Sequence, residues 1–114
     1  MTATDPLLRR VVNEQLGAVV FVQNYLQLDF DGIRLTTNVW PVVTIEANEY
    51  RFGESGYRDA LCSFIAHKVV ATSETDAELG INFATGRLAI SLLEDISIEH
   101  AIAHDTTTDD WSWW

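Results

Sequence analysis

The 114-residue sequence is poor in cysteine, in basic residues and in uninterrupted apolar runs. Cys62 is its one cysteine, so no disulfide can form within the chain. This favours a reducing compartment, because small secreted domains often carry paired cysteines. No stretch approaches the ~18 consecutive apolar residues of a membrane-spanning helix, and the first residues lack the apolar run of a signal peptide. We therefore expect a cytoplasmic protein that does not associate with membranes.

Basic residues are few: 7 lysines and arginines stand against 17 aspartates and glutamates, which gives a net charge of −10. A negative field repels phosphate backbones and anionic lipids, because binding to DNA requires lysine and arginine to displace counterions. Nucleic acid is therefore not an expected partner. A basic protein would instead be attracted. The alternative is that the charge serves solubility alone.

What is present indicates one globular domain over residues 1–114. Apolar residues make up 47% of the chain and charged residues 21%, a composition typical of folded proteins. The length is close to the commonest size of a single domain. We see no internal repeat, linker or low-complexity segment.

Two segments have the apolar spacing of short amphipathic helices. The first begins at Asp5-Pro6, a capping residue followed by a proline suited to the first helical position, and ends at Gly17. Its apolar residues are Leu7, Leu8, Val11, Val12 and Leu16. The second runs over residues 57–67 after a cap at Ser55, and its apolar face comprises Tyr57, Leu61, Phe64 and Ile65.

Alternating and β-branched residues predict strands in most of the remaining chain. Residues 18–29 are expected to be extended, to turn at Asp31-Gly32 and to return over 33–39. At Pro41 that strand must break, bulge or lie on a sheet edge, because proline donates no ladder hydrogen bond; the strand resumes over 42–47. Residues 69–72, 79–83 and 88–92 predict a three-strand meander with a turn at Thr85-Gly86, whereas 96–102 is either strand or helix. The fold class we expect is α+β, an antiparallel sheet of about five to seven strands with two short amphipathic helices packed against it.

Two groups of residues suggest chemistry. His100 and His104 are four positions apart in acidic surroundings, so they share one face and are a candidate metal pair, although surface histidines explain them equally well. Cys62 is the candidate nucleophile of a small hydrolase or isomerase that would also use His100 or His104. A buried structural cysteine is the alternative. We find no established active-site motif, and we expect neither a cofactor nor enzymatic activity.

The last residues of the sequence are the best candidates for an interaction site. Trp111, Trp113 and Trp114 are three of its four tryptophans. In a strand, Trp111 and Trp113 would share one face and Trp114 would lie on the other. These residues either close the core of their own chain or form a homodimer seam or partner-binding patch, because aromatic residues are enriched at interfaces. Tyr57 and Arg58 form a second candidate contact surface.

A resemblance follows from the order of three features between residues 18 and 102. They are the long hairpin, the segment Gly-Tyr-Arg-Asp-Ala-Leu at 56–61, and a strand–turn–strand with the pattern Phe-x-x-Gly-x-Leu at 83–88. This order resembles small bacterial proteins of unknown function, some of which are immunity-type proteins that neutralise a toxin by binding it. The resemblance implies no catalytic residue. Together with the charge, it predicts a non-enzymatic, acidic protein-binding domain, an immunity-type inhibitor of a basic toxin; a small-ligand or metal carrier is the alternative.

Overall fold

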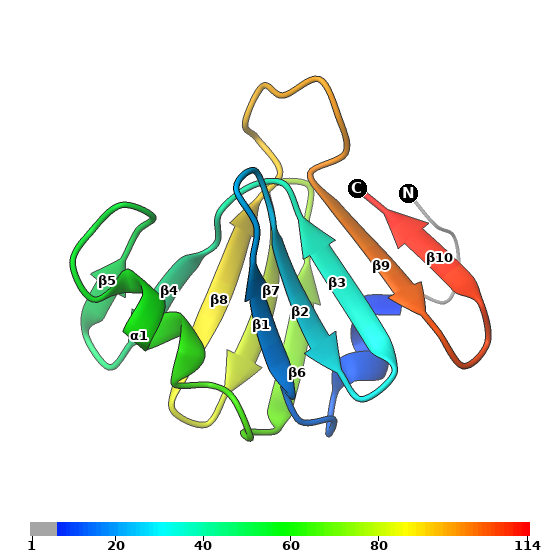
Figure 1. Cartoon of the computed structure of the whole chain (residues 1–114), viewed down its shortest axis with the longest axis horizontal. Coiled ribbons are helices and arrows are strands. Elements are labelled where there is room, and N and C mark those ends of the chain that lie inside the picture. The colour runs from blue at the N-terminus through cyan, green and yellow to red at the C-terminus, as the bar shows by residue number, and fades with distance from the viewer. Residues whose placement is uncertain (1–6) are drawn as a thin grey trace.

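The computed structural model describes residues 7–114 and arranges them in two antiparallel sheets of five strands each. The first sheet has the order β1-β2-β3-β9-β10 and the second β5-β4-β8-β7-β6 (Figure 1). The strands of the first sheet are β1 (Ala18–Phe21), β2 (Leu26–Phe30), β3 (Ile33–Thr37), β9 (Ala101–Asp105) and β10 (Asp110–Trp113). Those of the second are β4 (Val42–Ile45), β5 (Asn48–Tyr50), β6 (Val69–Glu74), β7 (Glu78–Phe83) and β8 (Gly86–Ser91).

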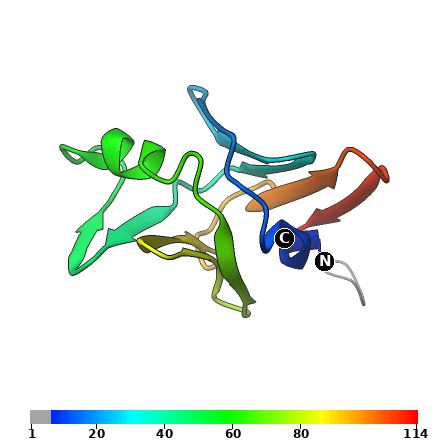
Figure 2. The ribbon, with the colours of Figure 1, turned by 90° about the horizontal axis from the view of Figure 1, so that it is seen from below.

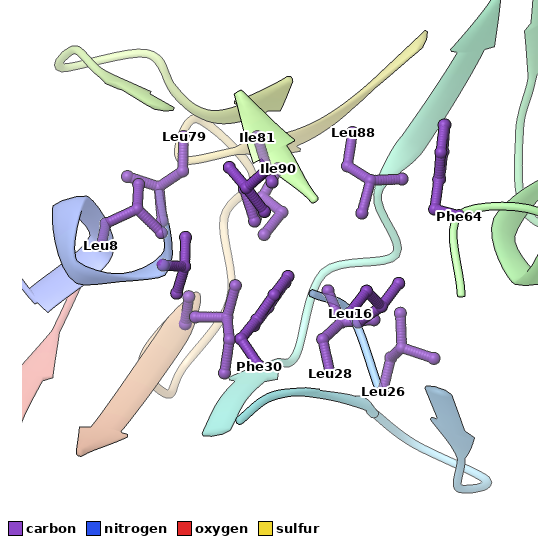
Figure 3. Close-up of a cluster of buried hydrophobic side chains, with 14 of the residues drawn as sticks. Leu8, Leu16, Leu26, Leu28, Phe30, Phe64, Leu79, Ile81, Leu88 and Ile90 are labelled. Atoms are coloured by element: carbon purple, nitrogen blue, oxygen red, sulfur yellow. The ribbon is translucent and has the colours of Figure 1, made fainter. Parts of the chain in front are cut away.

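The two sheets form layers whose inner faces supply the core. Seen from below, the cyan, orange and red strands of the first sheet lie above the green and yellow strands of the second (Figure 2). Leu26, Leu28 and Phe30 on β2 are fully buried, and so are Leu79 and Ile81 on β7. Figure 3 shows these side chains pointing toward one another across the space between the sheets. Burial of alternate residues on facing sheets is the packing of a β-sandwich.

The hairpin between β2 and β3 forms as the sequence predicts. Its two-residue loop is Asp31-Gly32, with φ angles of 46° and 97°. Positive φ at both central residues matches the right-handed twist of the flanking strands, and glycine and aspartate tolerate it. The hairpin fixes the register, so that Phe30 pairs with Ile33 and Leu28 with Leu35.

The predicted interruption at Pro41 is confirmed and marks a change of sheet. β3 ends at Thr37 in the first sheet, and β4 begins at Val42 in the second. Tyr57 anchors this crossing, since its hydroxyl donates a 2.6 Å hydrogen bond to the carbonyl oxygen of Pro41. Burial raises the pKa of the Tyr57 phenol far above its ordinary value, so the hydroxyl keeps its proton.

Two short helical segments close the open sides of the sandwich. The 3-10 segment η1 (Leu7–Val11) contacts β6, β9 and β10, and its Leu7, Leu8 and Val11 are buried. On the opposite side, α1 (Tyr57–Cys62) contacts β4 (Figure 2). Phe64, which follows α1, stacks on Phe83 with ring centroids 4.4 Å apart. Within residues 7–114, no helix has the length and apolar character that crossing a bilayer requires.

The prediction of one sheet with two amphipathic helices is therefore wrong. The predicted start of the first helix at Asp5-Pro6 lies outside the described residues. The described part is a single 3-10 turn, after which Asn13 takes a φ of 74° and the chain becomes extended. The backbone N–H of Asn13 donates to the carbonyl of Val69 (2.8 Å), and that of Leu16 donates to His67 (3.0 Å). Leu7, Leu8, Val11 and Leu16 are buried as expected, because a tight turn followed by an extended segment turns them inward as well as a helix would.

The second predicted helix is shorter than expected. It begins after Gly56, whose φ is 86°, and no side chain caps it, so Ser55 does not have the predicted role. It ends at Cys62, and Ala66 then takes a φ of 75°. Its predicted apolar residues Tyr57, Leu61 and Phe64 are buried. Ile65, the fourth residue of that predicted face, is exposed, because the helix ends at Cys62 and does not carry it inward. The spacing thus identified three of the four residues but not the length of the helix.

The strand predictions are correct in part. The meander β6-β7-β8 is confirmed, with its turn one residue earlier than expected, at Ala84-Thr85. Residues 18–29 are two strands rather than one, because a turn closed by the N–H of Val22 on the carbonyl of Tyr25 (2.9 Å) separates β1 from β2. For residues 96–102 the sequence left strand and helix open. Residues 101–102 are strand, the start of β9.

Gly86, the first residue of β8, provides a test of this packing. A Cβ atom there would overlap the carbonyl oxygen of Thr44 on the neighbouring strand and crowd the ring of Phe64. We expect Gly86→Ala to lower the free energy of unfolding by about 1–3 kcal/mol, because backbone cannot move aside as a flexible side chain can. Chemical denaturation measures this.

Gly17→Ala is the matched control, since a Cβ there makes only ordinary contact, 3.7 Å from the carbonyl oxygen of Asp29. It should be neutral or raise stability by about 0.4–1 kcal/mol through the unfolded chain. Equal stability of the two variants would contradict the packing described at Gly86.

Candidate functional site

Strand β10 presents two tryptophans to solvent. Trp111 and Trp113 are each 50% exposed, and Ser112 between them is fully buried. Alternate residues of a strand point to opposite faces, so both indoles share one face, as the sequence predicts, and the burial of Ser112 shows that it is the outer face of the first sheet. Large aromatic side chains contribute more to binding than most residues do. Two half-exposed tryptophans on one face are therefore a candidate binding surface.

The register of the first sheet places further residues beside these indoles. Trp113 pairs with Ile102 on β9, and Trp111 pairs with His104. On β3, Thr36 pairs with Ile102 and Arg34 with His104. We call the outer surface formed by Arg34, Ile102, His104, Trp111 and Trp113 the tryptophan face.

His104 holds Trp111 in place. The two rings stack nearly parallel, with centroids 3.8 Å apart and an angle of 10° between their planes. The Nε2 atom of His104 lies 3.0 Å from Oδ1 of Asp109, in the loop between β9 and β10. Because neighbours on both sides fix the imidazole, it provides a rigid support for the indole.

A partly buried charge network connects the β9–β10 hairpin to η1. Nη1 of Arg10 donates hydrogen bonds to Oδ2 of Asp105 (2.9 Å), Oδ2 of Asp110 (3.0 Å) and Oγ1 of Thr108 (3.3 Å). Thr107 donates to the other carboxylate oxygen of Asp105 through its N–H (3.0 Å) and its hydroxyl (2.7 Å). These bonds position the strand that carries the tryptophans.

The same contacts keep both carboxylates ionised. Hydrogen bonds from Thr107 and then from Arg10 lower the pKa of Asp105 to about 2, against the opposing effect of burial. Hydrogen bonds from Arg10 and then from Thr108 lower the pKa of Asp110. Sequence reasoning missed this network, although a signal exists: Asp105 continues the inward-facing series of Ala101 and Ala103, and a buried carboxylate requires a partner.

Trp114 differs from the other two tryptophans. It is partly buried against the core, and its Nε1 donates a 2.6 Å hydrogen bond to Oε2 of Glu74 on β6. Of the two alternatives for the terminal aromatics, packing against the core of the same chain holds for Trp114. Trp111 and Trp113 face outward, and a homodimer seam or partner-binding patch stays a prediction for them.

The two residues of the second candidate surface also differ in exposure: Tyr57 is buried and Arg58 is exposed. Tyr57 is a core residue, 2% exposed, so it is not available to a partner as predicted. The Arg58 guanidinium lies 5.7 Å from the ring centroid of Phe21. An unpredicted stack lies nearby, in which Trp40 and the half-exposed Phe52 are 4.2 Å apart between ring centroids.

The two candidate metal ligands, His100 and His104, contact different groups. Nε2 of His100 contacts the carbonyl oxygen of Glu94 at 2.7 Å, while His104 stacks on Trp111. Four positions along a strand correspond to about 13 Å, too far for one ion to bind both rings. Within residues 7–114, no group of three or more His, Cys, Asp or Glu side chains is placed to hold a metal.

The candidate nucleophile is not near the candidate bases. Cys62 ends α1 and is partly buried. His100 and His104 belong to β9 and the loop before it, and Figure 1 shows α1 and β9 on opposite sides of the molecule. The proposed combination of Cys62 with either histidine therefore has no geometric support.

A hollow of about 710 Å³ lies where the two sheets meet beside Trp114. Leu8, Arg9, Glu74, Asp76 and His100 contribute to its walls. It is open to solvent, and His100 in its wall contacts the carbonyl oxygen of Glu94.

Comparison with models of protein families, with curated proteins and with solved structures gives no match.

The charge network predicts a pH dependence of stability. The pKa of Asp105 in the folded protein, about 2, lies below the ordinary ~3.9, so its ionised form stabilises the fold above about pH 4 and this contribution is lost as pH falls toward about 2. Asp105→Asn should be less stable than the native protein at neutral pH. The difference should shrink between about pH 4 and pH 2 in urea unfolding.

Asp76→Asn controls for the change in net charge, because Asp76 is exposed. A gap between the native protein and Asp105→Asn that stays constant down to about pH 2 would contradict the network.

Ser112 gives a second prediction. Its hydroxyl is buried and has no hydrogen-bond partner among the described residues. An unsatisfied buried hydroxyl costs about 1–3 kcal/mol, so Ser112→Ala should raise the free energy of unfolding by roughly 1 kcal/mol. Ser63→Ala is the control and should lower it, since the Ser63 hydroxyl donates a 2.6 Å bond to Ala60. Destabilisation by Ser112→Ala would show that the hydroxyl has a partner.

Proposed function

We propose that this protein is a non-enzymatic binding domain whose partner is a basic protein that docks on the tryptophan face. The observation that carries the proposal is the pair of half-exposed indoles of Trp111 and Trp113 on one face. Tryptophan is strongly enriched among the residues that dominate binding energy, because it buries a large area and loses little conformational freedom. The support from His104 reduces that loss for Trp111 further.

Charge supports a basic partner. The chain carries a net charge of −10, and acidic side chains border the tryptophan face. The Asp109 side chain is 84% exposed and that of Asp110 is 53% exposed, both at the hairpin end of β10. Such a rim attracts a basic surface over long range, while the indoles supply the contact area.

The proposal also includes the class of protein. An immunity-type inhibitor that blocks a basic toxin agrees with the small size, the acidic charge and the aromatic face, and with the resemblance described above. We place its action in the cytoplasm, since the one cysteine forms no disulfide. The dispersed positions of Cys62, His100 and His104 favour binding over catalysis.

The test compares the immobilised native protein with Trp111→Thr/Trp113→Thr in capturing basic proteins from a lysate of the source organism. We expect the native protein to retain one basic protein at near one-to-one stoichiometry and to release it in high salt, because salt screens exposed charges. Loss of two central tryptophans, at about 2 kcal/mol or more each, should weaken binding by more than about 100-fold.

Val70→Thr is the matched control. Val70 is 55% exposed but lies on β6 in the second sheet, so Val70→Thr makes the same kind of apolar-to-polar change away from the tryptophan face. Thermal unfolding verifies that each variant is folded. Equal capture by the native protein and the double tryptophan variant would exclude the tryptophan face, and capture unaffected by salt would exclude the electrostatic contribution.

A further inference from the structure

The hydrogen bonds of β9 determine which backbone groups of β10 face away from the sheet. At the two ends of β9, the N–H of Asn38 donates to the carbonyl of His100 (2.9 Å) and the N–H of Thr106 donates to that of Gly32 (2.8 Å), so the register turns the bonds of Ile102 and His104 toward β3. The N–H of His100, which precedes the strand, donates to the carbonyl of Trp114 (2.7 Å). The N–H of Trp114 donates to Ala101 (2.9 Å), so the odd-numbered residues bond to β10. These two sets alternate along an antiparallel strand.

The free backbone groups of β10 therefore belong to the two exposed tryptophans. Ser112 pairs with Ala103 and Asp110 with Asp105, and these residues bond toward β9. The N–H and C=O groups of Trp111 and Trp113 point the other way, and β10 is the last strand of the first sheet among the described residues. Two donors and two acceptors thus form an edge on which an added strand can pair.

Carboxylates lie at both ends of this edge. Asp109 and Asp110 lie where β10 begins. Glu74 lies at the other end, bonded to the indole of Trp114, and Asp76 contributes to the same hollow. Arg10 offsets Asp110, Arg9 lines the same hollow as Glu74, and Arg34 on the tryptophan face pairs with Asp29 at 2.9 Å. Carboxylates remain in excess.

We infer that the β10 edge accepts an extended, lysine- or arginine-bearing segment of the partner as an additional strand of the first sheet. The inference rests on the proposed function and adds how the partner binds. Main-chain hydrogen bonds to Trp111 and Trp113 supply affinity, and alternate side chains of the segment fall on the tryptophan face. A cation there lies beside an indole, the aromatic ring that attracts cations most strongly.

The test follows backbone amide exchange in the ¹⁵N-labelled full chain. The probe is a seven-residue peptide of alternating lysine and valine, blocked at both ends. At a peptide concentration about ten times its Kd, exchange of the Trp111 and Trp113 amides should slow about tenfold, because only the free protein exchanges them. Unchanged exchange at these two amides overturns the inference.

Two controls separate strand addition from charge attraction. The same peptide with methylated backbone nitrogens keeps every charge and side chain but cannot donate, and it should give no protection. Trp113→Lys should weaken peptide binding at least tenfold, whereas Val20→Lys should not, since Val20 lies on β1 at the opposite edge of the same sheet. Equal binding of the methylated peptide, or equal effects of both variants, overturns the inference.

Other outcomes are distinguishable. If the basic protein captured by the native chain leaves the Trp111 and Trp113 amides unprotected, strand addition is wrong and the proposed function stands. If protein concentration alone slows these amides and doubles the sedimenting mass, the edge is occupied by a second copy and the inference is overturned. If the peptide protects the two amides but no basic protein is captured, the proposed function fails while the edge retains its binding property.

Discussion

The structure depends on the apolar contact between the inner faces of its two sheets. Leucine, isoleucine and phenylalanine side chains from β2, β3, β7 and β8 fill the space between the layers. A sandwich of two sheets is open at both sides, and water would reach this core there. The segments η1 and α1 close these sides, which explains why helical turns that contribute little regular structure are nonetheless buried.

The segment η1, which closes one side of the sandwich, also positions the candidate binding surface. η1 carries Leu7, Leu8 and Val11 into the core and directs Arg10 toward the β9–β10 hairpin. One segment therefore seals the core and orients the strand that carries Trp111 and Trp113. Arg10 links core packing to the position of the tryptophan face, which therefore depends on the interior more than its exposure suggests.

The sequence predicts the inward-facing residues better than the elements that carry them. Alternation identified the β2–β3 hairpin and the β6–β8 meander, because side chains of a strand repeat every two residues. Helical spacing failed over residues 7–16, since Leu7, Leu8 and Val11 are buried equally well by a 3-10 turn. That Trp111 and Trp113 share one face also follows from alternation, but alternation does not say that this face is the outer one. The stacking of His104 on Trp111 and the hydrogen bond from Arg10 to Asp105 cannot be predicted from alternation. The first depends on the register of the sheet, and the second joins residues distant in sequence.

The connectivity of the two sheets has a consequence for the order of folding. The second sheet is built from one continuous stretch, β4 to β8, whereas the first joins β1–β3 to β9–β10 from opposite ends of the chain. Pairing β3 with β9 must close a loop that contains the whole second sheet, and loop closure costs entropy before contacts repay it. We expect the β9–β10 hairpin to dock late. The surface that we assign to the partner would then exist only in chains that have finished folding, so binding would discriminate between complete and incomplete molecules.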